Sequence, residues 1–450
     1  MERYDLIVIG SGPGGYIAAQ RAGTLGKRVL LVEEKELGGV CTNVGCIPTK
    51  SLLAGAKRYK SAIDGTAFGL EVEKAHFNYA TAAAHKDETV KTLRSGIEFL
   101  MKSSKVEVVF GRAEVRDPHT VVVAEAVYQT DHLIIATGSR PALPPIPGAD
   151  APHVLTSDEI LALTERPESL VIIGGGVIGV EFASLFSMIG TRITVIEMMD
   201  EILPMADAEF AKLLRREMKG VEFLLGSTVE RIGEKSVTYT NKKGERKEIE
   251  STMVLLSVGR VPNVEGFEAL GLDIDRSGIR VNDRMQTNLP TVWAVGDVNG
   301  RSLLAHSASR MAEVAVANIF GKKEMRMRYH AIPTVVYSNP EVAGCGLTED
   351  EAKRLSIPVK SQTIQMRSSG RFIAEEGKRA GGLVKVIAHQ ESGAIVGIHL
   401  LGSYASENIW GAAALIEAEL RVQDVKEIVF PHPSVNELIK EACFQLDPSL

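Results

Sequence analysis

One structural unit occurs twice in this chain, 164 residues apart. Each copy reads as an apolar strand (Leu6–Ile9, then Leu170–Ile173), a Gly-x-Gly-x-x-Gly turn, a helix, and a second strand that ends on glutamate. The recurring positions are Gly10 and Gly174, Gly12 and Gly176, Gly15 and Gly179, Gly26 and Gly190, and Glu33 and Glu197. A chance glycine-rich turn would not reproduce all five spacings. We therefore predict an α/β fold with two Rossmann-like domains.

Each unit has the features of a dinucleotide site. The first glycine permits a tight turn, the second lets a pyrophosphate approach the backbone, and the third lets the helix pack close to the strand. The helix N-terminus offers unpaired N–H groups and the positive end of its dipole to phosphates. The glutamate that ends the second strand can accept hydrogen bonds from ribose hydroxyls. The sequence thus predicts two bound dinucleotides. The expected contacts are Gly10, Gly12, Gly15 and Glu33 for one, and Gly174, Gly176, Gly179 and Glu197 for the other.

Composition argues against several other classes of protein. The chain has 450 residues, which suggests about three domains, with 45 % hydrophobic and 24 % charged residues. A net charge of −6 without a long basic block predicts no binding to nucleic acid or to an anionic membrane. Four cysteines are too few for a disulfide-stapled secreted scaffold, so we expect a reducing compartment, the cytoplasm.

Two segments bear on membrane targeting. The first strand, Asp5–Ile9, follows Met1 almost at once, so we expect no signal peptide. Residues Ser169–Gly190 are apolar enough to resemble a membrane span, but they contain Glu181 and the second glycine motif. We interpret that segment as strand, turn and helix, and we predict no membrane association.

Cys41 and Cys46 lie in a glycine-rich run that leads into a helix, shortly after the first nucleotide motif. An undistorted helix would hold their α-carbons about 8.6 Å apart, whereas a disulfide needs less than about 7 Å. A pair that bonds here must therefore lie in a bent first turn. Gly45 permits the bend, and Pro48 removes the backbone hydrogen bond to Val44. The spacing suits a pair that opens and closes beside a cofactor.

The run Gly38–Lys50 resembles the active-site segment of the flavin-dependent pyridine nucleotide–disulfide oxidoreductases, most closely their dihydrolipoamide dehydrogenase branch. Two later runs, Leu133–Pro141 and Thr291–Asp297, resemble the flavin motifs of that family. The resemblance extends from Tyr4 to about Ala442. It implies that the first site binds FAD and that Asp297 contacts the ribityl chain. The cofactor contacts are expected to include Lys50, Thr137, Gly138, Ser139, Gly259, Asp297 and Ala305.

The resemblance also implies a charged pair beside the flavin. Lys50 closes the cysteine motif, and Glu181 follows the second glycine turn. We expect these two side chains to pair near the nitrogen that accepts hydride, where a buried pair would help hold negative charge. His306 lies in a segment expected to face the flavin, and structural packing is as good an interpretation of it as catalysis. The pKa of Cys46 should be lowered by the helix N-terminus and nearby cationic groups.

The second site is expected to bind NAD rather than NADP. Glu197 would repel a 2′-phosphate, and Met198, Met199 and Asp200 follow it, with no arginine close behind.

From Ile332 onward the chain resembles the interface domain of the same family, which forms a symmetric dimer. Its last segment contains His432-Pro433 and, five residues after the histidine, Glu437. The resemblance implies that His432, oriented by Glu437, is a base that acts in the partner's active site. The branch usually has another histidine where this chain has Phe430, so the substrate channel is expected to differ. Cys345 and Cys443 match no catalytic position, and we expect them to be small, partly buried residues.

These expectations divide the chain into four segments. Residues 1–145 form the first part of the FAD domain, 146–265 the NAD domain, 266–330 a segment that completes the FAD site, and 331–450 an α+β dimerisation domain. The implied enzyme oxidises dihydrolipoamide through Cys41, Cys46 and FAD and reduces NAD. The lipoyl group would come from a partner protein of a 2-oxo acid dehydrogenase or glycine-cleavage complex.

Two alternatives remain open at this point. One is an NADH-dependent reductase of another low-molecular-weight disulfide, which would use the same cysteines. The other is mainly a binding or structural subunit of a multienzyme complex.

Overall fold

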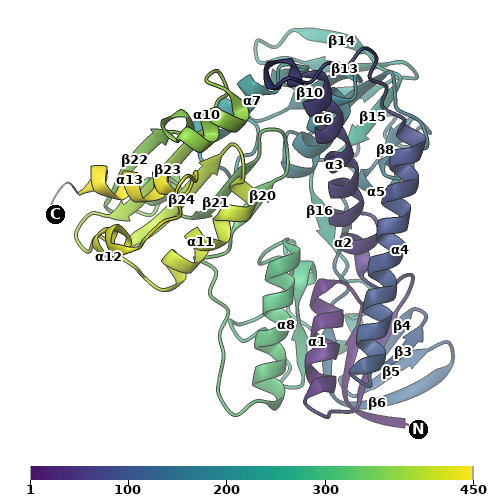
Figure 1. Ribbon diagram of the computed structural model, residues 1–450. Coiled ribbons are helices and arrows are strands. Elements are labelled where there is room, and N and C mark those ends of the chain that lie inside the picture. Colours follow the sequence, from purple (N-terminus) through teal and green to yellow (C-terminus); the bar gives the residue numbers. More distant parts are fainter. Residues whose placement is uncertain (1, 448–450) are drawn as a thin grey trace.

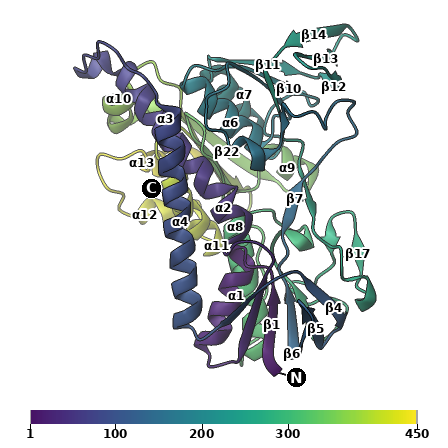
Figure 2. The same ribbon diagram turned by 90° about the vertical axis from the view of Figure 1, so that its right-hand side faces the viewer.

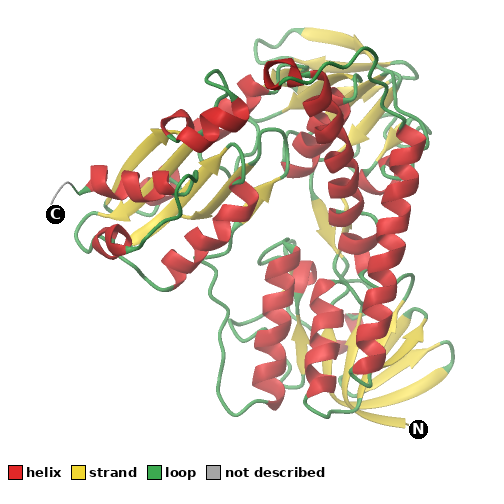
Figure 3. Ribbon diagram, in the orientation of Figure 1, coloured by secondary structure: helices red, strands yellow, loops and turns green. Residues whose placement is uncertain are grey.

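A computed structural model describes residues 2–447, which form two α/β domains and a C-terminal α+β domain (Figure 1). The predicted fold class is confirmed. The first α/β domain lies beside the N-terminus in Figure 1, the second lies above it, and the C-terminal domain lies to one side of both. Figure 3 shows helices packed against one side of the strands in each domain.

The first domain is built on a seven-stranded sheet of order β3-β2-β1-β6-β5-β4, with β19 paired to β6. The parallel strands are β1 (Glu2–Ile9), β2 (Val29–Glu33), β3 (Glu107–Phe110), β6 (Ala126–Ile135) and β19 (Val292–Ala294). The antiparallel strands are β4 (Ala113–Asp117) and β5 (Thr120–Val123). Along β1, Leu6 and Val8 face one apolar cluster while Ile7 and Ile9 face another, as the two-residue period of a strand requires.

Helices cover one face of this sheet. The apolar cluster on that face combines residues of β1 with residues of α1 (Pro13–Thr24), α4 (Tyr79–Ser103) and α8 (Ala305–Phe320). The other face is covered by the β4–β5 meander and by chain near η2 (Glu268–Leu270), the small sheet of β17 (Ile274–Asp275) and β18 (Gly278–Ile279), and η3 (Gly296–Asn299).

The second α/β domain is likewise built on a central sheet, in which all strands are parallel and in the order β11-β10-β9-β15-β8. Its strands are β8 (Val154–Leu155), β9 (Ser169–Ile173), β10 (Arg192–Glu197), β11 (Val221–Leu225) and β15 (Met253–Leu256), and its helices are α5 (Ser157–Ile160), α6 (Val177–Met188) and α7 (Ala208–Glu217). Helices α6 and α7 pack on one face of the parallel sheet. On its other face lies an antiparallel sheet of β12 (Thr228–Ile232), β13 (Ser236–Thr240) and β14 (Arg246–Glu250). The apolar segment Ser169–Gly190 is therefore strand, turn and helix, as predicted. Within residues 2–447, no helix combines the length and apolar character needed to cross a bilayer.

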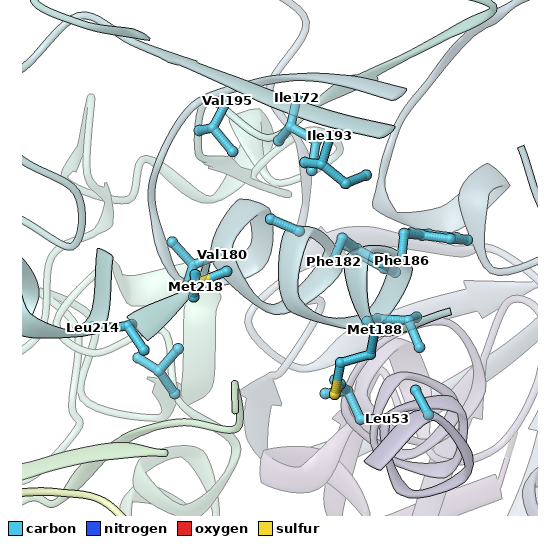
Figure 4. Close-up of a cluster of buried hydrophobic side chains, with 14 of the residues drawn as sticks. Leu53, Ile172, Val180, Phe182, Phe186, Met188, Ile193, Val195, Leu214 and Met218 are labelled. Carbon is cyan, nitrogen blue, oxygen red and sulfur yellow. The ribbon is translucent and has the colours of Figure 1, made fainter. Parts of the chain in front are cut away.

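Helix α3 (Cys46–Ile63) connects the cysteine motif to the core of the second α/β domain. After the short α2 (Gly39–Asn43), α3 runs alongside α4, with η1 (Gly65–Phe68) near the turn between them (Figure 2). Leu52, Leu53 and Ala56 of α3 are fully buried in the core of the second domain. Figure 4 shows Leu53 beside Met188 of α6. The short β7 (Ser139–Pro141) and β16 (Arg260–Pro262) pair as a second link between the domains.

The C-terminal domain has an antiparallel sheet of order β20-β21-β24-β23-β22. Its strands are β20 (Thr334–Val336), β21 (Val342–Gly346), β22 (Val359–Gln365), β23 (Leu383–His389) and β24 (Ile395–Leu401). Its helices are α9 (Glu349–Arg354), η4 (Met366–Ser368), α10 (Gly370–Glu376), α11 (Ala405–Glu417), α12 (Val422–Glu427) and α13 (Glu437–Leu446). Cys345 and Cys443 lie in the apolar cluster between this sheet and its helices and are fully rather than partly buried, and burial raises the pKa of each thiol to about 12.

A buried charge cluster fixes this domain to the second α/β domain. Lys385 of β23 has a side chain only 3 % exposed, and its Nζ lies 2.9 Å from Oδ2 of Asp207, which caps the N-terminus of α7. Glu349 Oε2 lies 2.7 Å from the same Nζ, and Glu209 Oε2 lies 3.2 Å from it. Because the lysine is enclosed by carboxylates, its pKa is raised although burial alone would lower it.

Candidate active site

The first glycine turn forms an open cradle at the N-terminus of α1. Gly10 has a φ of +93°, and a Cβ there would lie 2.4 Å from the carbonyl oxygen of Ala136. A Cβ on Gly15 would lie 1.8 Å from the Gly10 carbonyl oxygen, so only glycine permits the close helix–strand approach. A Cβ on Gly12 would meet nothing within 4 Å. The backbone at Gly12 therefore faces open space, as a phosphate-binding turn requires.

The second turn has the same geometry. Gly174 has a φ of +107° and its Cβ would lie 2.5 Å from the Ser257 carbonyl oxygen, while a Cβ on Gly179 would lie 2.1 Å from the Gly174 carbonyl oxygen. Gly176, like its counterpart, has nothing within 4 Å of a Cβ. The residues at both turns thus fit a dinucleotide pyrophosphate.

The two strand-end glutamates are held in matching ways. Glu33 Oε2 accepts the backbone N–H of Ser11 at 2.9 Å, and its Oε1 accepts that of Lys35 at 2.9 Å. Glu197 Oε2 accepts the N–H of Gly175 at 2.6 Å, and its Oε1 accepts that of Met199 at 2.7 Å. Each carboxylate is thereby fixed beside its glycine turn. The predicted repeat is therefore confirmed at the level of individual hydrogen bonds.

Both cradles open into a single cavity of about 2280 Å³, well above the roughly 300–1000 Å³ of a typical small-molecule pocket. Residues from both nucleotide units, from the cysteine motif and from the C-terminal domain contribute to its wall. The predicted contacts on that wall include Gly12, Glu33, Cys41, Cys46, Lys50, Thr137, Gly138, Ser139, Gly176, Glu181, Glu197, Gly259, Asp297, Ala305 and His306. The cavity has room for two large ligands, and both cysteines are on its wall.

A helix break separates the two cysteines. Cys41 lies in α2 and Cys46 is the first residue of α3, with Val44 and Gly45 between the helices. A Cβ on Gly45 would lie 2.8 Å from the Val40 carbonyl oxygen, which explains the glycine at this bend. Both cysteines are free thiols. The predicted bend is confirmed, although it is a complete interruption rather than a distorted first turn.

The two thiols differ in acidity. A hydrogen bond from the Cys41 thiol is the main cause that lowers the pKa of Cys46 to about 7, with the charge of Lys50 as a smaller contribution. The same hydrogen bond, with burial, raises the pKa of Cys41. In the reduced pair, the negative charge is therefore favoured on Cys46 over Cys41. The predicted direction is confirmed, but its largest cause is the neighbouring thiol rather than a cation or the helix end.

Lys50 and Glu181 form the expected pair. Lys50 Nζ lies 2.7 Å from Glu181 Oε2, and the Glu181 side chain is only 6 % exposed. The other oxygen, Oε1, accepts the backbone N–H of Tyr337 at 2.9 Å. The Tyr337 ring lies under the lysine, with Nζ 4.6 Å from its centroid. The C-terminal domain therefore closes one side of the charged pair.

The predicted flavin motifs meet at Asp297. Its Oδ2 accepts the hydroxyl of Ser139 at 2.6 Å, and Arg260 Nε donates to the same hydroxyl oxygen at 2.7 Å. Thr137 Oγ1 donates to the backbone carbonyl of Asn263 at 2.7 Å. Three segments distant in sequence thus build this part of the wall. His306 lies at the cavity, and its Nε2 donates a hydrogen bond to the Pro333 carbonyl oxygen at 2.8 Å.

His432 and Glu437 form a pair that lies away from the cysteines of the same chain. His432 Nδ1 lies 2.9 Å from Glu437 Oε1, and Glu437 Oε2 accepts the backbone N–H of Ser434 at 2.9 Å. That backbone bond first, and the histidine second, lower the pKa of Glu437. The His432 side chain is 81 % exposed, and α13 lies at the opposite side of the molecule from α2 and α3 (Figure 1).

Some residues of the site carried no sequence signal. Tyr337 and Arg260 reach it from segments whose own pattern predicts only strand or turn, and Ser11 occupies a variable position of the first glycine motif. Only the fold brings them to the cavity. Among the described residues, no three or more His, Cys, Asp or Glu side chains are arranged to hold a metal ion.

Comparison with protein families gives two matches. Residues 4–312 match the pyridine nucleotide-disulphide oxidoreductase family, and residues 332–443 match its dimerisation domain.

Curated relatives match over almost their whole length. Dihydrolipoyl dehydrogenase of Thermus scotoductus is 39 % identical, covering 98 % of this chain and 97 % of the relative. Dihydrolipoyl dehydrogenase of Mycoplasma pneumoniae is 36 % identical, covering 98 % of each.

A similar solved structure is the Cu(II) complex of RclA, an HOCl-induced flavoprotein disulfide reductase from Escherichia coli. It is 27 % identical with a TM-score of 0.88, over 99 % of this chain and 100 % of that one.

Proposed function

Because this chain belongs to the pyridine nucleotide-disulphide oxidoreductase family, we propose that it oxidises dihydrolipoamide to lipoamide and reduces NAD to NADH. The observation that carries the proposal is the Cys41–Cys46 pair, with its acidic Cys46, on the wall of a cavity that both nucleotide cradles share. The dihydrolipoyl dehydrogenase relatives supply the substrate class.

FAD binds at the first cradle and NAD at the second. Gly10, Gly12 and Gly15 take the FAD pyrophosphate, and Asp297, in its bond to Ser139, takes the ribityl hydroxyls. Bound FAD supplies two-electron chemistry that connects the dithiol pair to the nicotinamide. Glu197 selects NAD over NADP because its carboxylate is held by two backbone N–H groups where a 2′-phosphate would lie.

The thiol chemistry begins with the pair as a disulfide. His432 removes a proton from one thiol of dihydrolipoamide, and Glu437 holds the imidazole and stabilises its charge. The substrate thiolate attacks the Sγ of Cys41, the S–S bond breaks, and Cys46 leaves as a thiolate. The second substrate thiol then displaces Cys41, which forms lipoamide and leaves Cys41 as a thiol. Two electrons have passed to the cysteine pair, and one proton stays on His432 and one on Cys41.

The protein acts as a homodimer in which His432 serves the partner's cysteines. The matched dimerisation domain contains both His432 and Glu437. Within one chain, His432 is exposed and does not line the cavity of the cysteines. This position supports a base that acts on a site supplied by a second copy. The lipoyl groups come from a partner protein of a 2-oxo acid dehydrogenase or glycine-cleavage complex.

The charged pair acts on the acidity of Cys46. The charge of Lys50 adds to the lowering of the Cys46 pKa by the Cys41 thiol, and Glu181 fixes the lysine between α3 and α6. Lys50 and the predicted flavin contacts line the same cavity.

The proposal is tested by comparing initial rates of NADH oxidation by the purified yellow dimer with lipoamide and with glutathione disulfide. A strong preference for lipoamide is expected. Rapid reduction of glutathione disulfide with negligible lipoamide turnover would be consistent with the proposed redox centre but would contradict lipoamide as the substrate. A protein inactive with both, and also with a quinone acceptor, would instead be a binding subunit.

A further inference from the structure

Three exposed methionines line the second nucleotide site. Met198, Met199 and Met205 lie in the loop between β10 and α7. These residues are 71 %, 51 % and 58 % exposed, and all three are on the cavity wall. The other methionines among residues 2–447 are buried or half-buried, namely Met101, Met188, Met218, Met253, Met285, Met311, Met325, Met327 and Met366. The accessible thioethers of the described chain are thus concentrated in one loop.

The loop that carries them is anchored. Met199 donates its backbone N–H to Glu197 Oε1 at 2.7 Å and accepts the N–H of Gly226 at 2.9 Å. Leu203 donates its N–H to the Gly175 carbonyl at 2.9 Å, and the side chains of Ile202 and Leu203 are fully buried. The methionines are therefore exposed because a fixed backbone holds them toward the cavity. Fraying of the loop does not explain their exposure.

Exposed thioethers next to Glu197, the proposed ribose-binding carboxylate, are suited to binding a ligand that contains a flat heterocycle. A thioether is polarisable and flexible, and it packs favourably against aromatic rings. An apolar patch at the mouth of a cavity is typical of a ligand-binding surface. Converting a thioether to a sulfoxide makes the side chain polar and removes that packing surface.

We propose that Met198, Met199 and Met205 form an oxidant-sensitive modification site, and that their conversion to sulfoxides weakens binding of NAD and NADH. The inference rests on the proposed assignment of the second cradle to NAD. The oxidant is a peroxide, with hydrogen peroxide as the simplest member of the class.

In each reaction one oxygen atom passes from hydrogen peroxide to the methionine sulfur. The S–O bond forms, the O–O bond breaks and water leaves, so the sulfur loses two electrons and the peroxide gains them. The competing thiols are protected in the resting enzyme. Cys345 and Cys443 are buried with pKa values raised to about 12, and Cys41 and Cys46 are closed as a disulfide in the proposed cycle.

The first arm of the test maps the modification. The FAD-loaded dimer is treated with hydrogen peroxide, with and without NAD, and methionine sulfoxide is followed by peptide mass spectrometry. We expect the three loop methionines to react about tenfold faster than the half-buried Met325, and bound NAD to slow them. Equal rates at Met325, or no protection by NAD, would overturn the inference.

The second arm measures NADH oxidation with a quinone acceptor, which does not depend on the disulfide substrate. Peroxide should raise KM for NADH roughly fivefold with little change in kcat, and a thiol reductant should not reverse the effect. In the triple variant M198L/M199L/M205L, KM should not change on treatment, whereas M325L should respond like the parent protein. A KM unmoved by complete oxidation refutes this inference alone. Failure to oxidise NADH before any treatment would instead refute the proposed function.

Discussion

Replacing Lys50 by glutamine should raise the pKa of Cys46 and slow its reactions at neutral pH. The pKa of Cys46 is about 7, so roughly half of it is thiolate at pH 7. Lys50 follows Cys46 by one helical turn in α3, a spacing of about 6 Å between side chains. Its side chain is one-third exposed (33 %), so water screens part of its charge.

The size of the effect follows from Coulomb's law. With an effective dielectric constant of about 40, a unit charge at about 6 Å contributes about 1.4 kcal/mol, or one pKa unit. A rise from about 7 to about 8 lowers the thiolate fraction at pH 7 to about 0.09. Alkylation of Cys46 by iodoacetamide should then slow about fivefold at pH 7 and be unchanged near pH 10.

Replacing Glu181 by glutamine should lower the pKa of Cys46 and speed its alkylation at pH 7, although by a smaller factor than the slowing in K50Q. The negative charge of Glu181 raises the pKa of Cys46, so its removal increases the thiolate fraction. Because half of the thiol is already ionised at pH 7, the gain in alkylation rate cannot exceed about twofold. The double variant K50Q/E181Q removes both charges and should react at nearly the rate of the parent.

The assay uses the enzyme reduced in the absence of oxygen, alkylated between pH 5 and pH 10, with Cys46 identified by peptide mass spectrometry. Lys57→Gln is the matched control, because Lys57 lies on the same helix and pairs with Glu341 at 2.9 Å. The reasoning is refuted if the midpoint of the K50Q profile does not move to higher pH, or if K57Q moves it equally.

Replacing Cys46 by serine should abolish lipoamide turnover while yellow flavin stays bound, and retained turnover in a lipoamide assay would contradict the proposed chemistry. His432→Gln should lower kcat/KM for dihydrolipoamide by about 10²–10⁴ and leave NADH-to-quinone activity largely intact, whereas equal loss of both would make His432 structural. Lys385→Met should lower stability by about 3–5 kcal/mol at pH 7, because Asp207, only 4 % exposed, loses its cation. Without its cation, the Asp207 carboxyl has a raised pKa in the folded variant. The loss in unfolding free energy should therefore shrink as pH falls toward the ordinary Asp pKa of about 4 and grow as pH rises, as measured by thermal unfolding. An equal deficit at pH 5 and pH 8 would contradict this account.

The sequence predicted the parts of the site that local geometry determines. In each glycine turn the helix lies so close to the strand that only glycine fits, and the middle glycine leaves the backbone open. Because these requirements fix the spacing of the glycines, the turns can be recognised in the sequence of both copies. The predicted strands Leu6–Ile9 and Leu170–Ile173 lie within β1 and β9, and the predicted helix ends at Gly26 and Gly190 have left-handed φ values of +77° and +89°.

The contacts that the sequence could not predict join segments distant along the chain. Tyr337 reaches Glu181 and Lys50, and Arg260 reaches Ser139, through the packing of one domain on another. The Lys385 cluster was equally hidden, since a lysine in an alternating strand is typical of a solvent-facing position. The pairing of Lys50 with Glu181 was predicted only because a family resemblance supplied the partner. Charge alone would have allowed many others.

Helix α3 has a consequence for how the molecule melts. Its first turn carries Cys46 at the cavity, while Leu52, Leu53 and Ala56 are part of the apolar core of the second domain. The second nucleotide domain cannot unfold without exposing these side chains and loosening the helix that holds the thiolate. We therefore expect the two nucleotide domains to behave as one cooperative unit, with a single calorimetric transition and amide exchange protection that falls together across α3 and α6.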